Sequence, residues 1–233
     1  MKSMYVLAFF ACTGVAHATI VQVQAQCNIF GAGYAVPPDP GGGGGGVLPI
    51  MIPVSYVPGG YVWLSSVTGQ VSAGVVFPLH GADGGTSASG TTDVLSWGGI
   101  SGLIHENRTL FLTGVFLGPS SASNPAPPRL NVTNANSQVE FSPLIAQSFF
   151  MGDGRDASHT EQRFYIPFGA TRLFLGFVDA LDFGNPTSNP GHYADNSGHI
   201  MATVNVLPAP AGALVGLGFL GTRCRRRRGM SCV

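Results

Sequence analysis

Short runs of β-branched and aromatic residues, separated by turn-forming residues, limit the possible fold of this chain more than any other feature. Each run is bounded by Gly, Pro, Asn or Asp, and the clearest examples fall at residues 60–67, 109–117, 163–167, 171–178 and 199–206. Such runs are typical of strands, and no segment of the body repeats apolar residues with the period of a long helix. The pattern predicts an all-β fold, an antiparallel β-sandwich or jelly roll.

Composition agrees with a folded body. Glycine and proline are abundant, with 34 and 17 residues, but 15 Phe and a hydrophobic content of 45% favour a packed core over disorder. The low-complexity stretch, Pro-Pro-Asp-Pro at 37–40 followed by glycine throughout 41–46, predicts a flexible surface loop or linker. We therefore expect a Pro/Gly-rich segment and linker over 19–53 and the β-sandwich domain over 54–206.

The first 18 residues have the order of a secretory signal peptide. Lys2 precedes an apolar stretch at 5–15, and Ala16-His17-Ala18 places small residues on both sides of one position, as in a signal peptidase site. The segment 1–18 is therefore predicted to form a signal helix that directs export. The body that remains contains a single cysteine, Cys27, so we expect no internal disulfide.

The C-terminal residues combine an apolar run, at 211–221, with a basic cluster. Around that run lie the residues of a possible sorting signal: Pro208, Ala209, Pro210, Arg225, Arg226, Arg227 and Arg228. This order resembles the PEP-CTERM sorting signal of Gram-negative bacteria, although the tripeptide lacks that family's glutamate. The resemblance implies that 207–233 anchors the protein through a short transmembrane helix in the inner membrane during transit. It also implies recognition by sorting and processing machinery, and a final location at the cell surface or in the extracellular matrix.

Two other interpretations of this tail remain open. One is an ordinary C-terminal tail anchor, and the other is a basic tail that contacts nucleic acid. The sorting signal is favoured over the second, because a nucleic-acid tail needs no apolar run before its charges.

The formal charge of zero conceals a division of charge along the chain. The 11 basic and 11 acidic residues balance, but the tail holds five arginines and Lys2 lies in the signal peptide, which leaves 5 Arg against 11 acids, a net charge near −6 (5 minus 11). A negative body repels the phosphates of nucleic acid and favours divalent cations. We therefore expect no nucleic-acid partner, and calcium is the cation to test.

The residues before the last predicted strand carry the clearest binding chemistry. Asp179 ends one strand, and residues 190–198, PGHYADNSG, lead into the next. Calcium takes about six to eight oxygen ligands, and this turn offers carboxylate, amide and backbone carbonyl oxygens close together. Asp179, Asp195 and Asn196 are the candidate ligands. The alternative is a simple hairpin turn with an Asx cap, because Asn and Gly tolerate positive φ.

The same residues resemble the calcium loop of bacterial galactose-binding lectins of the PA-IL type. The resemblance rests on Asp179 at a strand end and on the Asp-Asn-Ser-Gly turn that starts at Asp195. It implies that Asp179, Asp195, Asn196 and the carbonyl of His192 hold a calcium ion that bridges the protein to sugar hydroxyls. A further carbonyl would come from near Ala73. The sequence departs from that family in the length of the loop and in the acid at 195.

Two aromatic residues are predicted to contact a sugar ligand. Trp97 lies between Ser and Gly residues, where an indole ring can remain exposed, and Tyr193 lies in the candidate calcium loop. Trp63, inside an apolar run, is expected to pack in the core.

The sequence contains no recognisable catalytic set. It has neither a Gly-x-Ser-x-Gly elbow nor a His-Glu-x-x-His motif, so we predict no catalytic residues and no enzyme. The expected function is that of an exported, surface-anchored, calcium-assisted module that binds envelope or extracellular polysaccharide. A structural matrix protein without a specific ligand is the first alternative, and an exported glycoside hydrolase is the second.

Overall fold

The structure, a computed structural model, describes residues 17–87 and 90–207. The all-β expectation is confirmed, because these residues form strands and short 3-10 helices and contain no α-helix. No helix in this part of the chain is long and apolar enough to cross a membrane. Most of the predicted signal peptide, the tripeptide Pro208-Ala209-Pro210 and the arginines at 225–228 lie outside the described residues.

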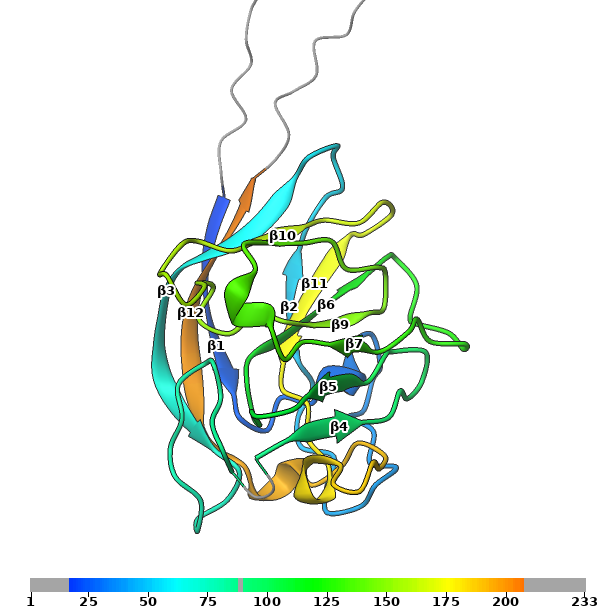
Figure 1. The fold of residues 1–233 in the computed structure, drawn as a ribbon. Helices are drawn as coiled ribbons and strands as arrows, with labels where there is room; N and C mark the ends of the chain where they lie inside the picture. The colour runs from blue at the N-terminus through cyan, green and yellow to red at the C-terminus, as the bar shows by residue number, and fades with distance from the viewer. Residues whose placement is uncertain (1–16, 88–89, 208–233) are drawn as a thin grey trace, which may run out of the picture.

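The strands form three sheets within the described residues (Figure 1). The first has the order β1-β12-β3-β10-β8, with the bounds His17–Gln24, Ser197–Leu207, Tyr61–Ser72, Arg163–Tyr165 and Glu140–Phe141. The second has the order β2-β11-β6-β9, with the bounds Ile50–Pro53, Arg172–Gly176, Thr113–Leu117 and Ser148–Phe150. The third has the order β4-β5-β7, with the bounds Thr92–Val94, Leu103–His105 and Leu130–Asn131.

Most strand pairs are antiparallel, as predicted, but two are parallel. β10 pairs parallel with β8, and β5 pairs parallel with β7. Both β7 and β8 are only two residues long. So few backbone hydrogen bonds do not fix a strand direction, and the loops that lead into β7 and β8 determine it instead.

The two larger sheets pack against each other through alternating side chains. Along β12, Ile200, Ala202 and Val204 are buried, whereas Met201 and Thr203 between them are partly exposed; along β3, Leu64 is buried. The buried side chains share one hydrophobic cluster with Leu173 of β11 and Phe116 of β6. This arrangement follows from the two-residue period of a strand, which places alternate side chains on one face of a sheet.

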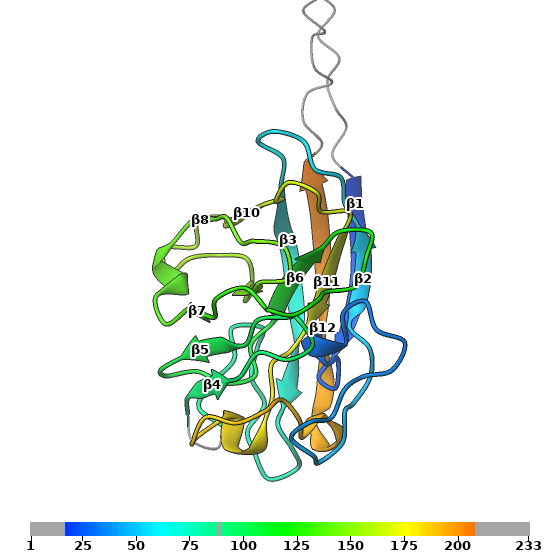
Figure 2. The same ribbon diagram turned by 90° about the vertical axis from the view of Figure 1, so that its right-hand side faces the viewer.

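A second cluster packs the smaller sheet onto the second sheet. It includes Val94 of β4 and Leu103 of β5 together with Val115 and Leu117 of β6. Every residue of β6 is buried, because clusters lie on both of its faces. Figure 2 shows β4, β5 and β7 to one side of the stacked larger sheets.

Residues 19–53 belong to the β fold, which corrects the predicted domain boundary at 54. β1 pairs with β12 from His17 opposite Val206 to Gln24 opposite His199, and β2 pairs with β11. The Gly/Pro content of the segment indicated a linker, but β12 offers a long partner strand that can hold β1 at the edge of the sheet. β1 starts within the predicted signal peptide, so cleavage after residue 18 would remove only its first two residues, which are exposed.

The predicted calcium loop lies at one end of the longest strands. The 3-10 helices η3 (Leu181–Phe183) and η4 (Tyr193–Asp195) lie at the end of the molecule opposite to the start of β1 and the end of β12 (Figure 1). The other 3-10 helices are η1 (Ile29–Gly31) and η2 (Ala135–Ser137). The predicted calcium loop therefore lies at the far end of β12 from residue 207.

Candidate cation site and adjacent groove

Three segments meet in a small pocket where β12 begins: residues 73–77, 179–183 and 192–195. Its volume is about 110 Å³. It is lined by Ala73, Phe77, Asp179, Ala180, Leu181, Asp182, Phe183, His192 and Asp195. β12 pairs with β3 as far as Ser197 opposite Ser72, which brings Asp195 next to the residues that follow β3. The predicted ligand residues Asp179, His192 and Asp195 thus line one pocket together with Ala73.

Left-handed backbone conformations concentrate at this pocket. Among the described residues, six non-glycine residues have positive φ, and three of them, Asp182, Phe183 and His192, line the pocket. Such conformations cost roughly 1–3 kcal/mol each and persist only where the surrounding structure maintains them. Tertiary contacts around the pocket therefore hold these residues in backbone conformations that they rarely adopt on their own.

The Asp179 carboxylate is the electrostatic centre of the site. Its side chain is 3% exposed. Oδ1 accepts a hydrogen bond from the amide of Ala180 at 2.7 Å, and Oδ2 accepts one from Nδ2 of Asn196 at 2.7 Å. Burial raises the pKa of this carboxyl well above its ordinary value, the two hydrogen bonds oppose the rise, and the negative charge of Asp195 adds to it. Within residues 17–87 and 90–207, no basic side chain forms an ion pair with Asp179.

Asn196 forms hydrogen bonds both to Asp179 and to the residue that follows β1. Besides Asp179, its Nδ2 contacts the carbonyl of Ala25 at 3.3 Å. Its Oδ1 is buried and has no hydrogen-bond partner among the described residues. A buried polar atom without a partner costs about 1–3 kcal/mol. The Asn196 amide is therefore incompletely satisfied in the absence of a ligand.

Tyr193 supports the site from within, which corrects its predicted role as a ligand contact. The side chain is fully buried. Its hydroxyl accepts a hydrogen bond from the amide of Asp179 at 3.0 Å and donates one to the carbonyl of Phe177 at 3.2 Å. A fully buried ring offers no surface to a sugar. Tyr193 instead fixes the backbone at Asp179, because its hydroxyl accepts from the amide of Asp179 and adds a second donor to the carbonyl of Phe177, which also accepts from the amide of Ile29.

The run of glycines at 41–46 packs behind the same loop, which corrects the prediction of a flexible linker. The amide of Gly41 donates to the carbonyl of Pro190, and the carbonyls of Gly42 and Gly44 accept from the amides of His192 and Tyr193, at 2.8 and 2.9 Å. These are backbone contacts between two segments about 150 positions apart in the chain. The glycine run therefore supports the loop of the candidate site from behind.

The absence of side chains makes this close approach possible. A Cβ atom at Gly44 would lie 2.5 Å from Cβ of Ala194, and a Cβ atom at Gly46 would lie 2.6 Å from Cβ of Tyr193. Real Cβ atoms essentially never approach another atom this closely. The glycine-rich composition indicated a flexible segment, but tertiary contacts fix these residues in place.

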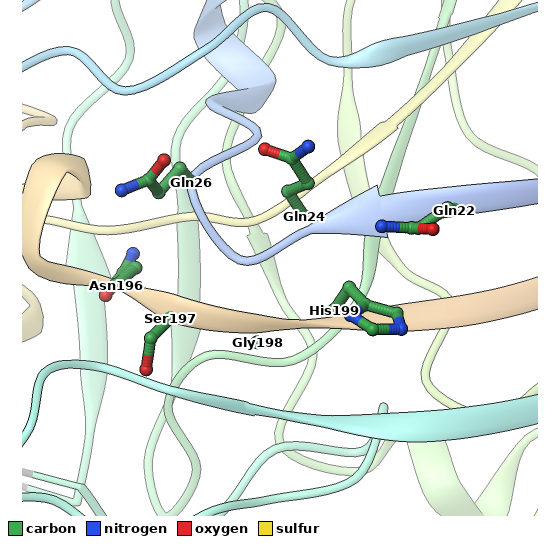
Figure 3. Close-up of a pocket in the computed structure, with 7 residues that line it drawn as sticks. All are labelled: Gln22, Gln24, Gln26, Asn196, Ser197, Gly198 and His199. Carbon is green, nitrogen blue, oxygen red and sulfur yellow. The ribbon is translucent and has the colours of Figure 1, made fainter.

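A polar groove lies next to the pocket, on the outer face of the first sheet (Figure 3). Its volume is about 340 Å³. It is lined by Gln22, Gln24, Gln26, Asn196, Ser197, Gly198 and His199. This groove was not predicted from the sequence. The signal for it is the glutamine at every second position of 22–26, which a strand places on one face.

The residues of the pocket fit a hard, oxygen-ligated cation. Calcium prefers carboxylate, carbonyl and amide oxygens, and three acidic residues, Asp179, Asp182 and Asp195, line the pocket together with backbone groups. In the described part of the chain, no three His, Cys, Asp or Glu side chains form a group that could hold a metal ion. Calcium binding here would therefore depend on backbone oxygens in addition to the carboxylates of Asp179 and Asp195.

Both tryptophans are half-buried, and neither lines the pocket or the groove. Trp97 is half-buried and packs against Tyr34, with ring centroids 5.4 Å apart, and it lines neither the pocket nor the groove. Trp63 lies between the buried residues Val62 and Leu64 of β3 and therefore on the opposite, outer face of the sheet. The apolar neighbours of Trp63 hid this alternation at the sequence level.

Comparison with known proteins identifies no relative for this chain. No protein-family model, no curated protein and no solved structure matches it.

Proposed function

We propose that this protein is an exported β-sandwich module that binds carbohydrate with the assistance of calcium. Asp179 and Asp195 would hold the cation through their carboxylates, and His192 and Ala73 through their backbone carbonyls. Asn196, predicted as a ligand, does not line this pocket; it would instead orient the Asp179 carboxylate through the hydrogen bond from its Nδ2. A bound calcium ion would supply positive charge to the buried carboxylate and coordination positions for sugar hydroxyls.

The burial of Asp179 is the observation that carries the proposal. A carboxylate that is 3% exposed, held only by neutral donors and close to a second acid, is costly to ionise. A divalent cation between the two acids offsets both the burial of the charge and the repulsion. A simple hairpin turn would not require a buried acid at this position.

The proposal includes export and anchoring through the two ends of the chain. Residues 1–18 would act as the signal peptide, and 207–233 as a PEP-CTERM-like anchor. The candidate site lies at the start of β12, and the anchor would follow its end. The 11 residues of β12 span about 35 Å, at roughly 3.3 Å per residue, so the site would face away from the membrane.

Calcium titration of the purified protein by calorimetry, together with thermal unfolding, tests the cation site. We expect saturable binding and a higher melting temperature, since a ligand at 100 times its dissociation constant stabilises a protein by about 2.7 kcal/mol. Asp179→Asn should abolish both effects. Glu161→Gln, which removes an acid outside the pocket, is the matched control and should bind like the wild type. Binding that survives Asp179→Asn would refute the site.

Chelation separates the proposed function from a purely structural cation. If calcium supports carbohydrate binding, a chelator should abolish retention on a polysaccharide while the protein remains folded. A matrix protein without a specific ligand would bind calcium and retain no polysaccharide.

Mass spectrometry of the protein recovered from the producing cells tests processing. A mature N-terminus at residue 19 and loss of the arginine cluster are expected, and an intact tail would contradict cleavage.

A further inference from the structure

The outer face of the first sheet carries a long uncharged surface that the cation site does not explain. At one end lies the groove of Figure 3, whose lining contains no Asp, Glu, Lys or Arg. The side chains of Gln22 and Gln24 project on the same face of β1, and Gln24 lies opposite His199 of β12. The groove thus presents a row of primary amides beside an imidazole and the hydroxyl of Ser197.

We infer that this groove is the carbohydrate site and that its ligand is an uncharged polysaccharide chain that lies along β12. The inference rests on the proposed carbohydrate function and specifies its binding surface and ligand class. Sugar hydroxyls both donate and accept hydrogen bonds. A primary amide also offers both donors and an acceptor, as do a hydroxyl and a neutral imidazole.

The charge of the body selects against acidic ligands. With a net charge near −6 (5 Arg minus 11 acids) and no cationic side chain in the groove, a polyanion would be repelled without a local partner. A cationic ligand would in turn find no carboxylate among the lining residues. The complement of an uncharged surface of donors and acceptors is an uncharged polyhydroxyl chain.

Asn196 gives independent support for a ligand at the groove. It lines the groove, it is 3% exposed, and its Oδ1 has no partner among the described residues. Native proteins satisfy nearly all buried polar atoms with a partner, which includes water or a ligand. A hydroxyl group in the groove can supply that partner.

Two hydrogen bonds connect the groove to the cation loop. Asn196 donates to the carboxylate of Asp179 at 2.7 Å, and Gln26 donates to the carbonyl of Ala194 at 2.9 Å. A change in the charge or position of Asp179 therefore reaches Asn196, and a shift of the loop backbone at Ala194 reaches Gln26. This connection gives calcium a physical route to assist carbohydrate binding without direct contact between the ion and most of the sugar chain.

The same face ends in an aromatic cluster, which favours a polymer over a single sugar. Tyr61 lies 5.5 Å from Trp63 and 5.9 Å from Tyr165, measured between ring centroids. Trp63 is opposite Asn205, six residues along β12 from His199, a distance of about 20 Å at roughly 3.3 Å per residue. Only an extended chain can contact both ends of this surface.

The ring geometry further restricts the ligand. The planes of Tyr61 and Trp63 are inclined by 51°, and those of Tyr61 and Tyr165 by 69°. Rings at these angles cannot lie together on a flat crystalline face. They can contact successive sugar rings of a single twisted chain. Arg163 and Glu140 form an ion pair at this end, with 3.9 Å between the charged atoms. The guanidinium of Arg163 also lies over the ring of Tyr61, 5.2 Å from its centroid, so Trp63 and Tyr165 offer the freer ring faces.

The test is retention of the purified full-length protein in gels that contain a soluble polysaccharide. Dextran, laminarin and galactomannan serve as uncharged probes and alginate as an acidic probe, each with calcium and with a chelator. The double variant Gln22→Ala/Gln24→Ala removes two exposed amides from the groove. Gln138→Ala, an exposed glutamine near β8 at the other edge of the sheet, is the matched control.

We expect retention by at least one uncharged probe, a loss of affinity of about tenfold or more in the double variant, and no change in the control. Calcium titration and melting temperature of the double variant should match the wild type, which shows that the fold and the cation site are intact. Trp63→Ala should weaken binding to long chains and leave short oligosaccharides unaffected.

The outcomes separate this inference from the proposed function. Wild-type affinity in the double variant, with retention still dependent on calcium, would overturn the groove and leave the calcium-assisted function standing. Preference for alginate would overturn the uncharged ligand class. Retention of no probe would overturn the groove, and calorimetry would then decide the cation site on its own. Groove-dependent retention that ignores the chelator would overturn the role of calcium instead.

Discussion

A single alanine in the glycine run should show whether this segment supports the candidate site. Gly46 has φ of +67°, and a Cβ atom there would lie 2.6 Å from Cβ of Tyr193 and still closer to the carbonyl oxygen of Gln26. Gly42 has φ of +77°, and a Cβ atom there would meet nothing within 4 Å. The two positions share the backbone conformation and differ in the space around it, so Gly42→Ala is the matched control for Gly46→Ala.

The structure gives the expected magnitudes. A left-handed conformation costs a residue with a Cβ atom roughly 1–2 kcal/mol, which applies to both variants. Gly46→Ala must in addition displace Tyr193 or Gln26, and such overpacking costs about 1–3 kcal/mol more. For a domain of this size, 1 kcal/mol lowers the melting temperature by about 2–4 °C. Gly42→Ala should therefore lose about 2–8 °C and Gly46→Ala about 4–20 °C.

Thermal unfolding followed by circular dichroism measures both variants under the same conditions. We also expect Gly46→Ala to weaken calcium binding, because Tyr193 holds the backbone of Asp179, whereas Gly42→Ala should retain it. Equal losses in the two variants would refute the argument, since only the shared strain would then matter. A melting temperature unchanged in both would mean that the run behaves as the flexible linker that its composition indicates.

Three further outcomes follow from the site. Tyr193→Phe removes a hydroxyl bonded to the backbones of Asp179 and Phe177, so urea unfolding should show a loss of about 1–3 kcal/mol, and wild-type stability would contradict this role. Because burial raises the pKa of Asp179, the folded calcium-free protein holds this proton more tightly than the unfolded chain does, and its stability should fall as pH rises from the ordinary value of 3.8 through the raised folded value. Asp179→Asn should remove that part of the pH dependence, and calcium affinity of the wild type should rise with pH over the same range; a pH-independent affinity would be inconsistent with this. Trp97→Ala should lower the melting temperature through the lost contact with Tyr34 and leave calcium and polysaccharide binding unchanged, and reduced retention would restore the original prediction for Trp97.

Local patterns predicted the strands well where a run was long and its alternation regular. The runs at 60–67, 171–178 and 199–206 contain most of β3, β11 and β12. Only the second half of the run at 109–117 is a strand. β1 was missed because its apolar alternation is short and precedes a Gly/Pro-rich segment, and because its partner β12 lies at the other end of the sequence.

The sequence by itself determined the all-β class, the negative body and the residue types of the candidate cation loop. These properties depend on composition and on periods of a few residues, which a linear reading contains. Only the tertiary structure decided that Asp179, His192 and Asp195 share a pocket with Ala73, that Tyr193 is buried, and that Trp63 faces outward. It also decided that the glycine run at 41–46 is hydrogen-bonded to the loop of the site. The reason is that each of these properties depends on the pairing of β12 with β1 and β3, which brings together segments separated by more than a hundred residues.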